Sequence, residues 1–164
     1  MTPASVQLIG EDFSPWTEKA LWALDHHRVH YAFEQYQPLI EEPWLRIRTR
    51  NLTRRATVPV LIAEREILSD SLAIARWAEG RGGSSLFPAG REREIQTWNE
   101  RSDRALRAGR ALFFERLSRD PEAQSDNLPP VVPRRLRPLL RPVVRTGIAY
   151  LRMKHGADRE LTDR

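Results

Sequence analysis

The chain has 164 residues, of which 40% are hydrophobic and 30% charged, enough for one folded domain and part of a second. It has no cysteine, which excludes disulfides, thiolate metal sites and any mechanism that uses a protein thiol as nucleophile. The sequence has neither the long apolar run of a membrane span nor the basic and apolar regions of a signal peptide. We therefore expect a soluble, cytoplasmic protein without a membrane partner.

The formal net charge of +5 is distributed unevenly along the chain. Residues 1–80 contain 9 Lys and Arg against 11 Asp and Glu, whereas residues 81–164 contain 18 against 11. The segment 127–157 has seven basic residues and no acidic one. Such a segment can bind nucleic acid or an anionic surface. The interleaved aromatic and glycine residues that usually accompany nucleic-acid binding are lacking, so the pattern favours a solvated helix face.

The first elements are a buried strand and an amphipathic helix. Residues 6–9 form a short apolar run that ends at Gly10, as expected of a strand. Ser14 is a favoured helix N-cap, and Pro15 suits the first helical position, where a missing N–H costs nothing. We expect this helix to end at residues 26–27, and its apolar positions repeat at spacings of three and four: Trp16, Ala20, Leu21 and Leu24.

Five further elements complete the first 80 residues. Pro59 must lie at the start of a strand, because proline inside a central strand removes a hydrogen bond of the ladder. The five elements follow the first strand and helix, so the complete order is strand, helix, strand, helix, strand, strand, helix. The predicted elements are a strand at 31–35, a short helix within 43–52, a strand at 58–62 joined by a hairpin at 63–66 to 67–68, and a helix from 69–71 to about Gly80.

The second half of the chain reads as mostly helical. Residues 81–90 have the composition of a linker, and a long amphipathic helix is predicted over 91–117. A polar loop is predicted over 120–133, and Pro138 and Pro142 predict no regular helix until after Pro142. We expect one stripe of the long helix to pack inward, namely Ile95, Trp98, Ser102, Ala105, Leu106, Gly109, Leu112 and Phe113.

Three motifs stand in a specific order along these elements. In this register, with the LFP linker and a long helix that carries Trp98, the chain resembles the cytosolic glutathione transferases, in particular the classes with serine or cysteine at the active position. The motifs are Ser14-Pro15-Trp16-Thr17, Val58-Pro59-Val60-Leu61 and Ser69-Asp70-Ser71.

The resemblance implies an architecture. It predicts an α/β thioredoxin-like domain over residues 1–80, with the order βαβαββα and a four-stranded mixed sheet that has helices on both faces. A linker at 81–90 and a partial, apparently truncated, all-α domain at 91–164 follow. The resemblance covers about residues 6–117 well and the rest loosely.

The resemblance also implies a site for glutathione as co-substrate. Ser14 would be the catalytic residue, whose hydroxyl stabilises the glutathione thiolate. Val58 would pair with the cysteinyl backbone of glutathione next to a cis Pro59, and Asp70 with Ser71 would receive the γ-glutamyl end. Read alone, Ser14 is equally an N-cap, and so is the Asp70-Ser71 pair. Thr17 reads as a polar residue of the first helical turn.

The sequence departs from the family at the glycyl end of glutathione. Relatives often have a lysine near the second helix there, and this segment has none. A guanidinium suits a carboxylate equally well. The candidates that could replace the lysine are Arg46, Arg48, Arg50 and Arg54.

The histidines do not predict a metal site. His26, His27 and His30 allow an i, i+4 pair, but no carboxylate lies at ligand spacing. A solvated helix end explains them, so no metal is predicted. The tryptophans read as core or interface residues.

The resemblance implies a glutathione transferase that conjugates glutathione to small hydrophobic electrophiles, a detoxification function, and a homodimer. The alternative is a non-catalytic module of the same fold that binds glutathione or a partner and that could use the basic 127–157 segment. Nucleic acid is the less favoured partner.

Overall fold

The structure is a computed structural model that describes residues 6–38, 40–53, 55–64, 66–126, 128 and 132–157. The chain divides into two compact units, Met1–Asn99 and Glu100–Arg164. The division falls inside a long helix, whereas the predicted linker, 81–90, lies before that helix. The domain boundaries at 80 and 90 therefore stay a prediction. No helix in the described ranges is both long and apolar enough to span a membrane.

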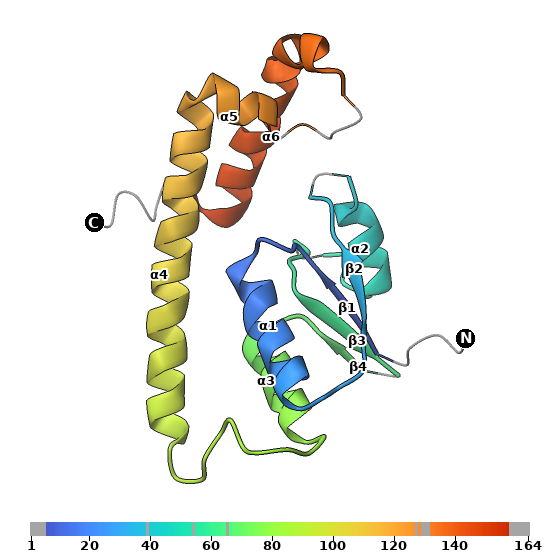
Figure 1. Cartoon of the computed structure of the whole chain (residues 1–164), viewed down its shortest axis with the longest axis vertical. Helices are drawn as coiled ribbons and strands as arrows, with labels where there is room; N and C mark the ends of the chain where they lie inside the picture. The colour runs from blue at the N-terminus through green and yellow to red at the C-terminus, as the bar shows by residue number, and fades with distance from the viewer. Residues whose placement is uncertain are drawn as a thin grey trace. The chain divides into compact units, whose positions relative to one another are not determined.

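The N-terminal unit has the predicted order of elements (Figure 1). Its sheet is four-stranded and mixed, in the order β2-β1-β3-β4, with β1 parallel to β2 and antiparallel to β3. The short helix ends at Arg48, earlier than residue 52, the end of the segment in which it was predicted. The elements are β1 (Val6–Gly10), α1 (Pro15–His26), β2 (Ala32–Gln35), α2 (Glu42–Arg48), β3 (Val60–Ala63), β4 (Glu66–Leu68) and α3 (Ser71–Glu79).

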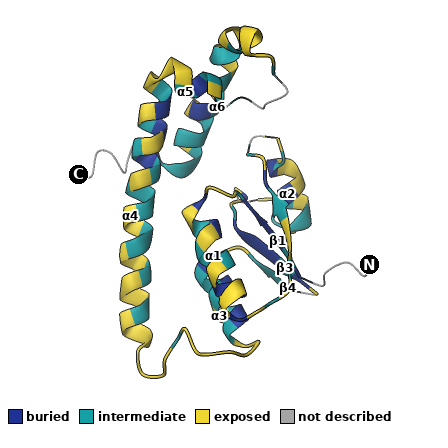
Figure 2. Cartoon of the chain, in the orientation of Figure 1, coloured by how far each residue is buried: buried dark blue, intermediate teal, exposed yellow. Residues whose placement is uncertain are grey.

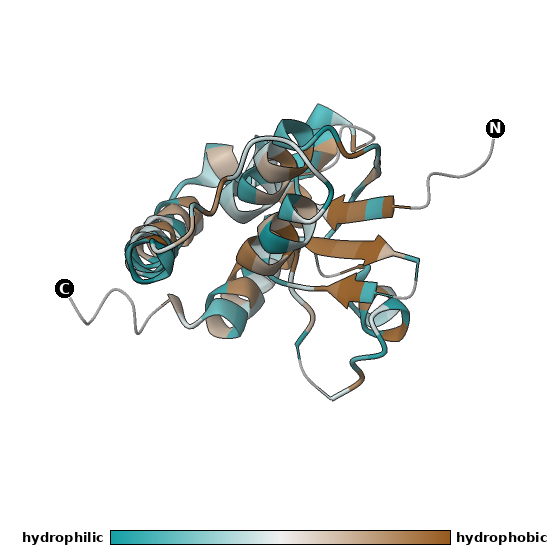
Figure 3. Ribbon diagram, turned by 90° about the horizontal axis from the view of Figure 1, so that it is seen from below, coloured by the Kyte–Doolittle hydropathy of each residue, from teal (hydrophilic) through white to brown (hydrophobic). Residues whose placement is uncertain are grey.

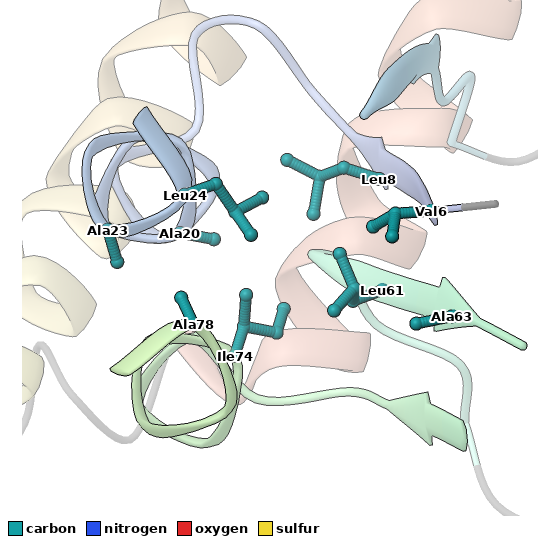
Figure 4. Close-up of a cluster of buried hydrophobic side chains, with 9 residues drawn as sticks. All are labelled: Val6, Leu8, Ala20, Ala23, Leu24, Leu61, Ala63, Ile74 and Ala78. Carbon is teal, nitrogen blue, oxygen red and sulfur yellow. The ribbon is translucent and has the colours of Figure 1, made fainter. Parts of the chain in front are cut away.

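Helices cover both faces of this sheet, as predicted. Successive side chains of a strand point to opposite faces, so Leu8 and Ile9 of β1 belong to different clusters. Leu8 packs with residues of α1 and α3, among them Leu24 and Ile74 (Figure 4). On the other face Ile9 packs with Leu45 of α2. The strands are accordingly hydrophobic along most of their length (Figure 3).

The C-terminal unit begins within α4 (Glu92–Arg119) and continues with α5 (Pro121–Asp126), a 3-10 turn η1 (Arg134–Leu136) and α6 (Arg137–His155). The predicted loop over 120–133 is wrong where α5 forms. The Asp120 carboxylate caps α5, because its Oδ1 accepts the amides of Glu122 at 2.9 Å and Ala123 at 3.0 Å. Pro121 follows as the first helical residue.

The prediction that Pro142 delays the last helix is also wrong, since α6 runs through it. Pro138 lies in the first turn, where an N–H has no partner in the helix. The N–H that Pro142 lacks would have paired with the carbonyl of Pro138, so only one helical hydrogen bond is lost. The Pro142 carbonyl accepts the Thr146 hydroxyl at 3.0 Å.

The predicted inward stripe of α4 is wrong for its two large aromatic residues. Trp98 is 61% exposed and Phe113 is 47% exposed. In Figure 2 the dark-blue, buried positions of α4 lie toward its C-terminal end. The buried residues of α4 are instead Ala111, Phe114 and Leu117. Ala111 and Phe114 pack against residues of the chain around the end of α6, namely Leu151 and Ala157. The amphipathic period predicts a covered face but does not say which turns the neighbouring helices cover.

Candidate functional site

The three sequence motifs meet at one end of the sheet. The last β1–β2 pair is Gly10 with Gln35, and the last β1–β3 pair is Ile9 with Val60. Since β3 runs antiparallel to β1 and β4, the carboxyl ends of β1 and β4 lie beside the amino end of β3. The Ser14, Val58-Pro59 and Asp70-Ser71 motifs adjoin these three strand ends, so the topology brings all three to the same end of the sheet.

Ser14 occupies the N-cap position of α1 but does not cap it with its side chain. Its backbone is extended, with φ −81° and ψ 121°, and its hydroxyl makes no cap hydrogen bond. The backbone alone shapes this turn: the Ser14 amide donates to the Glu11 carbonyl, and the Ser14 carbonyl accepts the Glu18 amide, both at 3.0 Å. The residue is 8% exposed. The N-cap reading therefore holds for the backbone and leaves the hydroxyl without a capping role.

Thr17 and Gly10 bring the start of α1 close to the end of β1. Thr17 is in the first turn, as predicted, but it is fully buried. A Cβ at position 10 would lie 2.5 Å from Thr17 Cγ2 and 2.8 Å from Thr17 Oγ1. Only glycine therefore fits at position 10 without a shift of Thr17 or of the backbone.

The Val58–Pro59 peptide bond is cis, which confirms the prediction. Pro59 is buried and Val58 half-buried. Both residues precede the first residue of β3 and its last pair with β1, Ile9 with Val60. The Val58 N–H and C=O consequently lie outside the β1–β3 ladder, which is the condition for pairing with an extended ligand.

Asp70 is the N-cap of α3 and uses one carboxylate oxygen for that role. Its Oδ1 accepts the amides of Leu72 and Ala73, each at 3.0 Å. Asp70 is exposed, whereas Ser71, the first residue of the helix, is 3% exposed. A carboxylate has about four acceptor positions, so the cap leaves capacity for a ligand ammonium group. The free amides at a helix N-terminus suit a ligand carboxylate.

Two of the candidate arginines are engaged with carboxylates of the chain itself. Arg48 Nη1 lies 2.8 Å from both Glu34 oxygens, and its Nη2 donates to Gln7. Arg46 Nη2 lies 2.6 Å from Glu42 Oε1. Arg50 is exposed, with φ 54°, and Arg54 lies outside the described residues. These pairings favour Arg50 over Arg46 and Arg48 as a partner for a ligand carboxylate.

The expectation that the histidines form a solvated helix end is wrong for His27, which is 6% exposed. Its Nδ1 contacts the Gly82 carbonyl, and its Nε2 lies 3.2 Å from Glu79 Oε2. His26 Nε2 lies 2.8 Å from the Ser84 carbonyl. Both rings thus fasten the end of α1 to the segment after α3. No cluster of three potential metal ligands occurs in the described part of the chain.

The Glu79 carboxylate has a second set of partners in the same segment. The Ser85 hydroxyl donates to it, as does the Leu86 amide at 2.9 Å. The Ser85 hydrogen bond is the main cause that lowers the pKa of Glu79 below its ordinary value, and the Leu86 and Phe87 amides and His27 act in the same direction. This cluster holds the structure together and is not part of the candidate ligand site. The sequence reading missed this cluster, because His27 and Gly82 are 55 residues apart and no local pattern connects them.

The fold is that of a thioredoxin-like domain, and the three sequence motifs lie at one end of its sheet. Residues 13–81 match the family described as glutathione S-transferase, N-terminal domain. This part of the chain is therefore similar to the glutathione S-transferase N-terminal domain.

Two solved structures are similar to the chain. One is the Tau class glutathione S-transferase MiGSTU of mango, Mangifera indica L., with 20% identity and a TM-score of 0.46. The match covers 74% of this chain and 49% of the mango protein. The other is TDR1 of Leishmania, a trimeric glutathione transferase, with 22% identity and a TM-score of 0.44. The match covers 75% of this chain and 28% of TDR1. The chain thus spans about half of the first protein and less of the second. No curated protein matches it.

Proposed function

We propose that the chain binds glutathione at the end of the sheet where α1 and α3 begin, and that it transfers the glutathione thiolate to a small hydrophobic electrophile. The observation that carries the proposal is the state of Ser14. It sits at the N-cap of a helix in a glutathione S-transferase N-terminal domain, and its hydroxyl makes no cap hydrogen bond. A hydroxyl in this position is available to a ligand.

Ser14 would act on the pKa of the glutathione thiol. A free thiol has a pKa of about 8.5, so little thiolate is present at neutral pH. A hydrogen bond to a charged group contributes about 1.5–3 kcal/mol, which lowers the pKa by roughly one to two units. The N-terminus of α1 adds a favourable potential of about 0.3–1 kcal/mol. Ser14 itself keeps its proton, and the thiol proton passes to solvent.

The reaction then forms a carbon–sulfur bond. The thiolate attacks the electrophilic carbon, and with an aryl halide the halide departs with its bonding electrons. In this scheme the protein binds glutathione through the Val58 backbone beside Pro59, and through Asp70 and Ser71 at α3. A role in detoxification, a homodimer and a cytoplasmic location remain parts of this proposal.

The alternative is a module of the same fold that binds glutathione without turnover. Conjugation by the wild type separates the two functions, and Ser14→Ala tests the role of Ser14. Ser102→Ala, at a half-buried serine of α4, is the matched control. We expect Ser14→Ala to change glutathione affinity by only a few-fold, because the peptide contacts remain. The pKa of bound glutathione, followed by thiolate absorbance, should rise. The rate with an aryl halide should fall about ten- to a hundredfold at neutral pH and recover partly at higher pH.

Each result decides a different part of the proposal. Binding without any conjugation by the wild type favours the non-catalytic module. Conjugation by Ser14→Ala at the wild-type rate at every pH leaves Ser14 as a backbone cap only. A wild type that does not bind glutathione in calorimetry overturns the proposal as a whole.

A further inference from the structure

The last described helix has an unusual distribution of polar and apolar side chains. On α6, Leu139, Val143 and Met153 are 73%, 67% and 60% exposed. Thr146 and Ala149, which continue the same row, are exposed as well. The spacings of four, three, three and four place these residues on one side of the helix. We call this row, Leu139, Val143, Thr146, Ala149 and Met153, the outward stripe of α6. It contains no charged residue.

Three arginines of the same helix make hydrogen bonds within the unit to which they belong. Arg137 Nε donates to the Val132 carbonyl at 3.2 Å, and its Nη1 lies 3.7 Å from Asp126 Oδ1. Arg141 donates to the Ser125 hydroxyl at 3.2 Å, and Arg152 donates to the Ser118 hydroxyl at 3.3 Å. The expectation of a solvated basic face over 127–157 is therefore wrong for these arginines.

The helix thus uses three of its arginines within its own unit and has its apolar row turned outward, with Arg145 exposed beside that row. A surface helix normally has the opposite arrangement, because apolar side chains gain free energy when they leave water. An exposed apolar row of this kind marks a surface that another molecule covers.

The charges at the rim of the stripe indicate what that molecule is. Arg134, Arg135 and Arg145 are exposed at the beginning and along one side of the stripe. The described residues 132–157 include no acidic side chain that could balance them. A second copy of α6 would bring further arginines to the same rim, which is unfavourable, whereas glutamate or aspartate there is favourable.

The shape of the stripe favours a helix over a lipid surface. Helices that lie on membranes carry Trp or Phe beside Leu, and Lys or Arg along the whole polar face. The outward stripe has neither aromatic residue, and three arginines of α6 are used internally. Its middle positions, Thr146 and Ala149, are small and allow a partner helix to approach closely.

We propose that the outward stripe of α6 binds an amphipathic helix of a partner protein, whose apolar row is flanked by acidic residues. The apolar rows interdigitate, and the acidic flanks lie against Arg135 and Arg145. This binding surface is independent of the glutathione site and does not require catalysis.

Synthetic peptides test the proposal with the whole chain. The probe is a 19-residue peptide, as long as α6, with leucines at the spacing of the stripe and glutamates on both flanks. Its partner probe has lysines in place of the glutamates. In fluorescence anisotropy the glutamate peptide should bind at least about tenfold more tightly than the lysine peptide, and more weakly as salt increases.

Variants locate the binding on α6. The double variant Leu139→Ser, Val143→Ser should weaken the glutamate peptide at least about tenfold. Arg145→Glu should reduce the preference for glutamate. Trp44→Ser is the matched control, because Trp44 is an exposed apolar residue, 57% exposed, on α2. It should bind the peptide as the wild type does.

Four results would overturn the proposal. They are equal binding of both peptides, no binding of either, a dimer in sedimentation that Val143→Ser dissociates, and adsorption to phosphatidylglycerol vesicles that Val143→Ser abolishes. Hydroxyl-radical footprinting of the monomer adds a direct check. Protection of Leu139, Val143 and Met153 without any peptide would mean that the stripe is already covered within the chain.

Discussion

Asp70 allows the capping role and the ligand role of one carboxylate to be measured separately. Its Oδ1 accepts two amides at 3.0 Å at the start of α3. Loss of such a cap costs about 1 kcal/mol, within a range of roughly 0.5–2 kcal/mol. For a unit of about 100 residues this corresponds to a decrease of roughly 4–8 °C in Tm. Asp70→Ala should show this decrease in thermal unfolding of the N-terminal unit.

Asp70→Asn should separate the two roles. Asparagine caps a helix about as well as aspartate, so the Tm should stay near that of the wild type. The negative charge for the ligand ammonium is lost, and a charged hydrogen bond contributes about 1.5–3 kcal/mol. Since about 1.4 kcal/mol is tenfold in affinity, glutathione should bind roughly ten- to 150-fold more weakly in calorimetry.

Asp120 is a matched control from the other unit. It caps α5 with the same geometry, through the Glu122 and Ala123 amides at 2.9 and 3.0 Å. Asp120→Ala should lower stability by a similar free energy and leave glutathione affinity unchanged. If Asp70→Asn binds glutathione as tightly as the wild type, Asp70 is a helix cap and the assignment of the ligand site at α3 is wrong.

Two further predictions concern stability. Gly10→Ala should destabilise the N-terminal unit by about 1–3 kcal/mol in denaturant unfolding, because the new Cβ meets Thr17. Adding Thr17→Ala should restore part of the lost stability. Full stability of Gly10→Ala alone would contradict the packing of β1 on α1. The pKa of Glu79 is lowered from 4.5 in the folded state, so its contribution is present above that pH and is lost as the pH falls through the folded-state value. Glu79→Gln should therefore lose less stability than the wild type as the pH falls. If the free energy of unfolding decreases with falling pH in the same way in both proteins, Glu79 does not have this role.

Much of the N-terminal unit could be predicted from the sequence because its signals are local. The Ser14-Pro15 pair marks the start of α1, and Asp70 marks the start of α3. Capping depends on a few neighbouring residues, so a short segment contains the whole signal. The cis bond at Pro59 was different, since it was predicted from the resemblance of three motifs in register and not from any single one.

The tertiary structure decided which of these side chains are engaged and which are free for other roles. The sequence offers four arginines as equals, namely Arg46, Arg48, Arg50 and Arg54. Only the packing of α2 and β2 places Arg48 against Glu34. His27 is a second example, because it is buried only where the segment around Gly82 packs against the end of α1. Both partners lie far away in the sequence, where no local pattern reports them.

The helices after residue 90 show the same limit most clearly. Their sequence determined that α4 and α6 are helical and amphipathic, because the 3.6-residue period is a local property. It did not determine that Phe114 is buried while Trp98 and Phe113 are exposed, or that three arginines of α6 make hydrogen bonds within their own unit. A helix can present more than one apolar face, and only the face that neighbouring elements cover gains free energy from burial. The choice of face is made by packing between segments, so only the assembled unit contains it.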